Sequence, residues 1–197
     1  DAMVKGRWQR AAYTALQPDP AADLSHEMRK KLDRWKLSVL PAHRVLRALQ
    51  VLPSLSQAHV QPRILAALLR TWWNGWCTAR RYQERADSPH HRCMLGCQGP
   101  DSIEHYATCR EVANFAQSQL QLPRPEGRED QLTAFLALDV GVRCIADSID
   151  YIRRRAMLTA CVYLAHNKWR HSGRPAGHTT LQILAQTLRE LRANNDD

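Results

Sequence analysis

Apolar side chains recur at intervals of three and four residues along most of the chain, which is the spacing of an amphipathic α-helix. Such stripes occur in residues 4–15, 24–39, 42–52, 62–76, 132–138, 142–169 and 181–191. Proline or glycine separates many of them, for example at Pro41, Pro62 and Gly173, where helices are expected to begin or end. No segment shows the alternation of apolar and polar residues that predicts a β-strand. The sequence therefore predicts an all-α protein, a bundle-like array of helices.

Two linkers divide this helical pattern. Residues 53–61 are rich in Ser, Gln and Pro, and residues 122–130 contain two prolines. We therefore expect N-terminal helices in 1–61, a central part in 62–121 and C-terminal helices in 122–197.

The central part contains a cluster of residues that bind soft metal ions, with the spacing Cys-x3-Cys-x7-His-x3-Cys. The four candidates are Cys93, Cys97, His105 and Cys109. Thiolates and imidazole suit Zn²⁺, and four of them fill the tetrahedral shell of a structural rather than a catalytic zinc ion. The alternative is a set of small buried thiols beside a surface histidine, but the segment has few large aliphatic residues to bury them. The sequence favours a small Cys-Cys-His-Cys zinc knuckle that staples the helices.

The local pattern predicts how this knuckle folds. Gly96 predicts a tight turn between the first two cysteines, and Asp101 is expected to cap a helix, with Glu104 completing a capping box. On that helix, expected to run to residue 120, His105 and Cys109 would share one face, with Cβ atoms about 5–6 Å apart.

The run from Cys93 through Ile-Glu-His at 103–105 to Cys109 resembles the zinc-binding segment that follows the reverse transcriptase in non-LTR retrotransposon polyproteins. Residues 73–82, Trp-Asn-Gly-Trp-Cys-Thr-Ala-Arg-Arg-Tyr, resemble the helix that leads into that segment, and the similarity covers residues 71–115. This chain has three residues in the first and last spacers, where many members have two and four.

This resemblance implies a C-terminal region of a reverse transcriptase that binds zinc and helps to hold template RNA or target DNA. It also implies a polymerase domain upstream in the same polyprotein. The chain begins at Asp1 and not at methionine, which is compatible with a piece of a longer protein.

The charge of the chain fits a nucleic-acid partner, either RNA or DNA. The net charge is +9, and 23 of the 28 basic residues are arginine, whose planar guanidinium matches phosphate and stacks on bases. The candidate contacts are Arg80, Arg81, Arg85 and Arg92, which are expected on the lead-in helix and before the first ligand, and Trp73, which is expected to turn away from a core containing Trp72 and Trp76. The polar face of 24–39 carries five more cations, which could meet phosphates or simply be solvated.

The sequence lacks the residues that a polymerase active site requires. The only consecutive aspartates, Asp196 and Asp197, lie at a polar terminus and do not resemble the paired aspartates of a polymerase. We therefore expect no enzymatic activity of the chain itself and no small-molecule substrate. No apolar run reaches membrane-spanning length, and no secretory signal begins the chain, so we expect no membrane partner and an intracellular, nuclear or cytoplasmic location.

Two alternatives to nucleic-acid binding remain. The chain could be a zinc-stapled helical module that binds another protein, or an inactive fragment of a retroelement. The other three cysteines, Cys77, Cys144 and Cys161, are interpreted as core thiols that do not bind metal.

Overall fold

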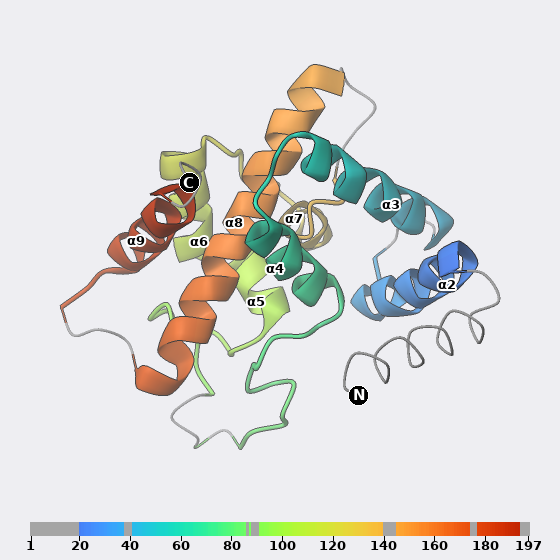
Figure 1. Cartoon of the computed structure of the whole chain (residues 1–197). Helices are drawn as coiled ribbons and strands as arrows, with labels where there is room; N and C mark the ends of the chain where they lie inside the picture. The colour runs from blue at the N-terminus through green and yellow to red at the C-terminus, as the bar shows by residue number, and fades with distance from the viewer. Residues whose placement is uncertain are drawn as a thin grey trace, which may run out of the picture.

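The computed structural model describes residues 20–37, 41–85, 87, 91–139, 145–173 and 177–193. Within these residues the chain forms helices and no strand (Figure 1). In order they are α2 (Pro20–Leu32), the 3-10 helix η1 (Asp33–Trp35), α3 (Pro41–Gln57), α4 (Pro62–Trp72), α5 (Ile103–Thr108), α6 (Arg110–Leu120), α7 (Arg128–Phe135), α8 (Ile145–Ser172) and α9 (Thr180–Ala193). The predicted all-α fold is confirmed. The helix expected in 4–15, the apolar positions Val39 and Val142, and Cys144 lie outside the described residues.

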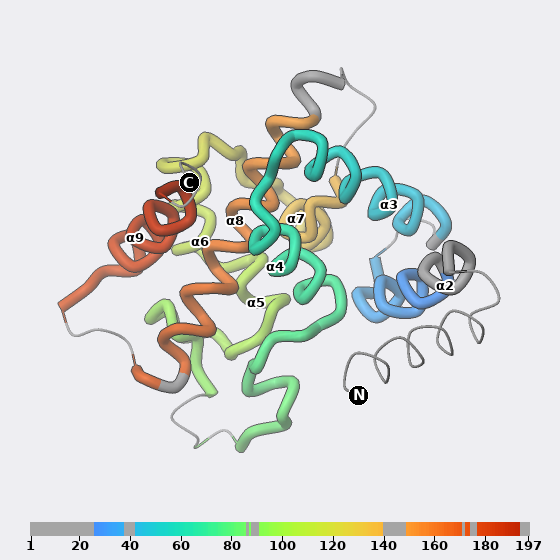
Figure 2. The backbone as a smooth tube through the Cα atoms, viewed as in Figure 1, coloured from blue at the N-terminus to red at the C-terminus, as the bar shows by residue number. Residues whose placement is uncertain are grey.

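Helix α8 runs through the middle of the molecule, between α4 and α9 (Figure 2). Its segment from Arg155 to Tyr163 is buried on every side, and the helix packs against α3, α4, α6, α7 and α9. A helix that is covered all around needs an apolar surface all around. The sequence meets this need, because only small, apolar or hydroxyl-bearing residues follow Arg155 up to Ala165.

Helix α4 is shorter than the sequence predicts, so the expected helix across residues 73–82 is wrong. Asn74 adopts a left-handed conformation with φ of 51°. The amide of Gly75 then donates to the carbonyl of Arg70 at 2.6 Å, and the amide of Asn74 donates to Thr71 at 2.9 Å. These two bonds form a Schellman motif, which ends a helix. The chain continues from Asn74 in turns.

The predicted linker at 53–61 is mostly helical. Helix α3 continues through Pro53 to Gln57, although an interior proline removes one backbone hydrogen bond. Val51 and Leu55, on either side of the proline, are buried in the core. The free energy of burying these side chains offsets the defect that Pro53 introduces.

Candidate metal centre and its surroundings

The four predicted ligands converge in the structure. One ligand atom from each of Cys93, Cys97, His105 and Cys109 lies within 4.8 Å of every other. The Sγ of Cys97 is 2.9 Å from the Nε2 of His105 and 3.6 Å from the Sγ of Cys109. In a tetrahedral site with Zn–S bonds of about 2.3 Å, neighbouring sulfur atoms lie about 3.8 Å apart. The cluster could therefore hold one metal ion after small movements of its side chains.

The first two thiols are carried by a closed loop. Gly96 has φ of 88°, which confirms the predicted tight turn, and its amide donates to the carbonyl of Cys93 at 3.1 Å. The amide of Cys93 donates to the carbonyl of Gly99 at 2.8 Å, and Arg92 and Pro100 form an isolated antiparallel bridge. These bonds close the loop that carries both thiols.

Gly99 lies directly against the imidazole of His105. A Cβ atom at Gly99 would be 2.0 Å from Cε1 and 2.3 Å from Nδ1 of that ring. No side chain fits there unless the ring moves. Gly99 thus allows the loop and the third ligand to approach each other, a role that the sequence alone does not reveal.

The predicted capping box is wrong. The N-cap of α5 is Ser102, whose Oγ accepts from the amide of His105 at 3.1 Å. Asp101 lies one residue earlier and is buried. Glu104 points to Arg80 instead and forms an ion pair of 2.7 Å with it.

The predicted continuous helix from 101 to 120 is also wrong, because it bends at the last ligand. Cys109 ends α5 and begins α6, with an extended backbone of φ −62° and ψ 127°. His105 and Cys109 therefore do not share a helix face. The bend at Cys109, rather than a helical repeat, turns its thiol toward the other ligands.

The thiols are electrostatically coupled. The hydrogen bond from Cys93 lowers the pKa of the Cys109 thiol to about 4 against the effect of burial, and His105 and the amide of Val112 add to the lowering. The same hydrogen bond and burial raise the pKa of Cys93 well above its usual range, and burial raises that of Cys97. Ionising all three thiols in this space requires a cation, which is the condition that a divalent metal ion satisfies.

Asp101 joins the metal-ligand segment to the rest of the fold. Its carboxylate is 1% exposed and accepts from the amide of Ala79 and the hydroxyl of Tyr106, both at 2.8 Å. On α8, the Nε2 of His166 lies 3.0 Å from it, and the guanidinium of Arg170 also bonds to it. Burial alone would raise the pKa of Asp101, but the hydrogen bond and charge of His166, with the other donors, hold it below its ordinary value.

Buried aromatic side chains pack against the metal-ligand segment. The ring of Trp76, fully buried as predicted together with Trp72, has its centroid 5.7 Å from that of Tyr106 and 5.4 Å from those of Tyr163 and His166. Leu95 and Ile103 are 1% exposed. The metal-ligand segment is therefore better anchored by apolar contacts than its short list of aliphatic residues suggests.

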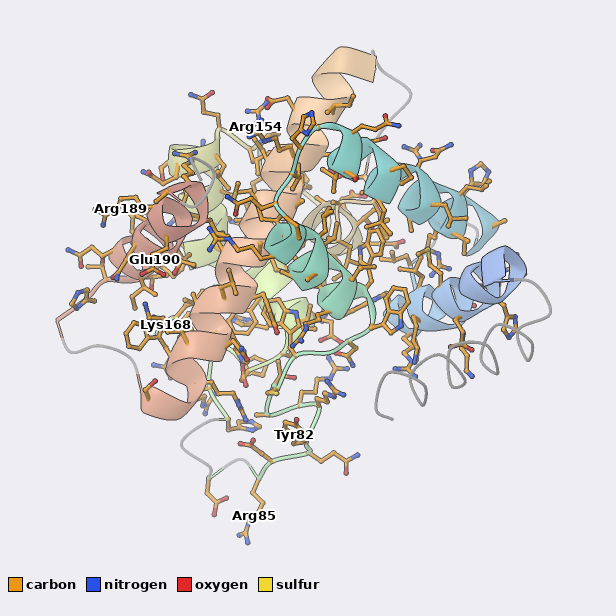
Figure 3. All side chains as sticks on the ribbon, in the orientation of Figure 1. Tyr82, Arg85, Arg154, Lys168, Arg189 and Glu190 are labelled. Atoms are coloured by element: carbon orange, nitrogen blue, oxygen red, sulfur yellow. The ribbon has the colours of Figure 1, made fainter. Side chains whose placement is uncertain are left out.

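None of the four predicted arginine contacts lies on a helix: Arg80 and Arg81 lie in a turn, Arg85 in irregular backbone and Arg92 in the isolated bridge. All four arginines are exposed. Arg85 pairs with Asp87 at 3.3 Å, Arg92 donates to the carbonyl of Gln98 at 3.0 Å, and the Arg81 guanidinium lies 5.9 Å from the ring centroid of Tyr82. Figure 3 shows Tyr82 and Arg85 on a segment that extends from one end of the molecule.

The sequence predicts Trp73 as the exposed aromatic residue, but in the structure the exposed aromatic side chain near the candidate arginines is that of Tyr82. Trp73 is half-buried against the core, whereas Tyr82 is 57% exposed. Cys77, interpreted as a core thiol, is only half-buried and accepts a hydrogen bond from the Tyr82 hydroxyl at 3.4 Å. Cys161 is fully buried as predicted, and burial raises its pKa to about 12.

Part of the arginine content serves the fold. Arg44 donates to the carbonyl of Leu32 at the end of α2, and Arg63 donates to Glu190 and Leu191 near the end of α9. Arg154 donates to the last carbonyl of α6 and Arg155 to the loop that follows. Cations that satisfy helix C-terminal carbonyls stabilise those helices. Because these arginines bind the protein's own carbonyl groups, the high arginine count supports a nucleic-acid partner less strongly than the sequence alone suggests.

Comparison with protein-family models, with curated proteins and with solved structures finds no match to this chain. In the described part of the chain, no helix combines the length and apolar character needed to cross a membrane. Fold and site together define an all-α protein with a Cys₃His cluster that could hold a metal ion.

Proposed function

We propose that Cys93, Cys97, His105 and Cys109 bind one Zn²⁺ as a structural staple. The observation that carries the proposal is the convergence of three thiols and an imidazole from a loop, a helix and a helix junction. Soft thiolate and imidazole ligands in a set of four favour zinc over magnesium or calcium, which prefer oxygen ligands. Because four protein ligands complete the shell, the ion has no open position for a substrate.

The zinc-stapled segment contacts nucleic acid in this proposal. Arg92 directly precedes the first ligand, and Arg81 and Arg85 lie in the segment before it; all three are exposed. Tyr82 adds an exposed aromatic face on which a base could stack. By its resemblance in residues 71–115, the chain is the C-terminal zinc-binding region of a retrotransposon reverse transcriptase, and it helps the polymerase domain to grip template RNA or target DNA.

Binding of a labelled RNA or DNA strand, measured against salt, tests the nucleic-acid part. We expect Arg81→Glu with Arg85→Glu to weaken binding about equally for all sequences and to flatten the slope of log K against log salt. The matched control is Arg189→Glu with Arg192→Glu on α9, which removes the same charge from exposed positions; Figure 3 shows Arg189 far from Tyr82 and Arg85. An unchanged slope in the first variant would mean that these arginines are only solvated.

The alternative is a zinc-stapled module that binds another protein. The observation that favours it is the internal use of Arg44, Arg63, Arg154 and Arg155, which lowers the number of cations available to phosphate. Absence of measurable affinity for RNA and DNA at low salt, with zinc bound, would select this alternative.

A further inference from the structure

A charged groove lies between η1, the turn at Arg80, α5 and α7. Its volume is about 410 Å³, within the range of ligand-binding clefts. Arg34, Lys36, Arg80 and Arg128 line it, with Glu104 and Glu129 as the acidic residues. The groove thus collects cations from three segments that are far apart in the sequence.

Among the described residues, one cation of the groove forms an ion pair with a carboxylate, and the other three do not. Arg80 pairs with Glu104 at 2.7 Å. Arg34, Lys36 and Arg128 are exposed, and none of these three forms an ion pair with a carboxylate that the structure describes. Their positive charge is therefore available to an anion from outside the chain.

The base of the groove is apolar and closed. Trp35, Leu37 and Leu132 line it and are 7%, 5% and 9% exposed. The indole of Trp35 donates to the carbonyl of Trp72 at 3.2 Å, which fixes the ring in the core. Among the described residues that line the groove, no aromatic face is open for a base to stack on. The groove therefore offers charge to an anion and little that could distinguish one base from another.

We propose that this groove binds the phosphodiester backbone of a nucleic-acid strand, with Arg34, Lys36 and Arg128 as the phosphate contacts. The inference rests on the proposed nucleic-acid function and extends it to residues outside the zinc-binding segment. Arg80 connects the two surfaces, because it lines the groove and directly precedes Arg81 in the exposed turn. A strand that leaves the groove at Arg80 meets Arg81 and Tyr82 next.

The test compares two triple variants of the full chain with equal loss of charge. Arg34→Gln, Lys36→Gln and Arg128→Gln remove the groove cations, and Arg153→Gln, Arg189→Gln and Arg192→Gln remove exposed cations elsewhere. Thermal unfolding and zinc content confirm that both variants fold. Fluorescence anisotropy with a labelled single strand of about twenty nucleotides gives the affinity at several salt concentrations.

The proposal expects a loss in affinity of about tenfold or more at low salt for the groove variant. Its salt slope should flatten by about 0.7 for each phosphate that the variant no longer neutralises, while the control stays within about twofold of the unchanged protein. Equal losses in both variants would overturn the groove assignment and leave the proposed function intact. No binding by the unchanged protein would overturn both.

A competition experiment tests the class of ligand. Unlabelled poly-glutamate of equal total charge should displace the strand from the unchanged protein much less well than unlabelled strand does. Equal competition would mean that the groove attracts any polyanion, and the assignment to nucleic acid would be wrong.

Discussion

The Nε2 atom of His166 lies 3.0 Å from Oδ1 of Asp101, across 65 residues of sequence, and both side chains are 1% exposed. His166 belongs to the central helix α8, and Asp101 stands between the second and third candidate metal ligands. The pair therefore fastens the metal-ligand segment to the middle of the helical core. A metal ion at the cluster would add to a segment that the fold already holds in position, so its loss should loosen the ligands more than the helices.

Replacing Cys109 with Ser should abolish zinc binding. Cys109 supplies a buried thiol with a pKa lowered to about 4, and serine is a far weaker zinc ligand because its hydroxyl stays protonated. Metal analysis of the purified proteins should give one zinc per chain before the change and none after it. Cys77→Ser is the matched control, because Cys77 lies outside the cluster, and its zinc content should stay at one.

Replacing Gly99 with Ala should weaken metal binding without removing any ligand. The new methyl group would lie 2.0 Å from the imidazole of His105, so the ring must leave its position. Forced displacement in a packed site costs about 1–3 kcal/mol, which corresponds to a loss of roughly fivefold to 150-fold in zinc affinity. Competition with a chromogenic zinc chelator measures this change.

Gly127→Ala is the control for that experiment. The nearest atoms to the added Cβ belong to the flexible Asp130 side chain, with Oδ2 at 2.9 Å, and none belongs to a metal ligand. Its zinc affinity should equal that of the unchanged protein. Equal affinity of Gly99→Ala would show that the ring of His105 can move at little cost.

Replacing Asp101 with Asn should destabilise the fold without removing any of the four candidate ligands. The change removes the carboxylate charge that faces Arg170 and His166 in the interior, and breaking one side of a buried charge pair costs about 3–5 kcal/mol. Urea unfolding measures the loss. Ser102→Ala, which removes only the N-cap of α5, should cost about 1 kcal/mol. Similar values for the two variants would mean that Asp101 is not the anchor.

The contribution of Asp101 should disappear in acid. Its pKa is lowered in the folded state, so its stabilising effect is complete above the pKa of the unfolded chain, about 3.9. The effect is lost as the pH falls from there through the lowered folded value, where the carboxylate takes up a proton. The difference in unfolding free energy between the unchanged protein and Asp101→Asn should stay constant down to about pH 4 and then shrink. A difference that is the same at all pH values would exclude an ionised Asp101.

Some features could be predicted because neighbouring residues encode them. Apolar stripes repeat within one or two helical turns, so the sequence alone predicts the all-α fold. The same stripes predict the burial of Trp72 and Trp76. The cluster of candidate metal ligands could also be predicted from the sequence, because Cys and His at close spacing are rare and chemically specific. Gly96 marked its turn for the same local reason, a backbone conformation that glycine adopts freely.

Other features required the tertiary structure. Nothing near Asp101 shows that its partners are His166 and Arg170, which lie 65 and 69 residues away. The bend at Cys109 interrupts what looks like one helix. Asn74 ends α4 although the apolar stripe of that helix continues in the sequence to Trp76. Whether an arginine holds a helix end, as Arg44 and Arg63 do, or faces solvent, as Arg34 and Arg128 do, depends on what packs beside it. The sequence by itself determined the all-α class and the chemistry of the ligands, since both depend on residue type and local period. Only the packing of distant segments decided which polar groups are buried, because burial is a property of the whole fold.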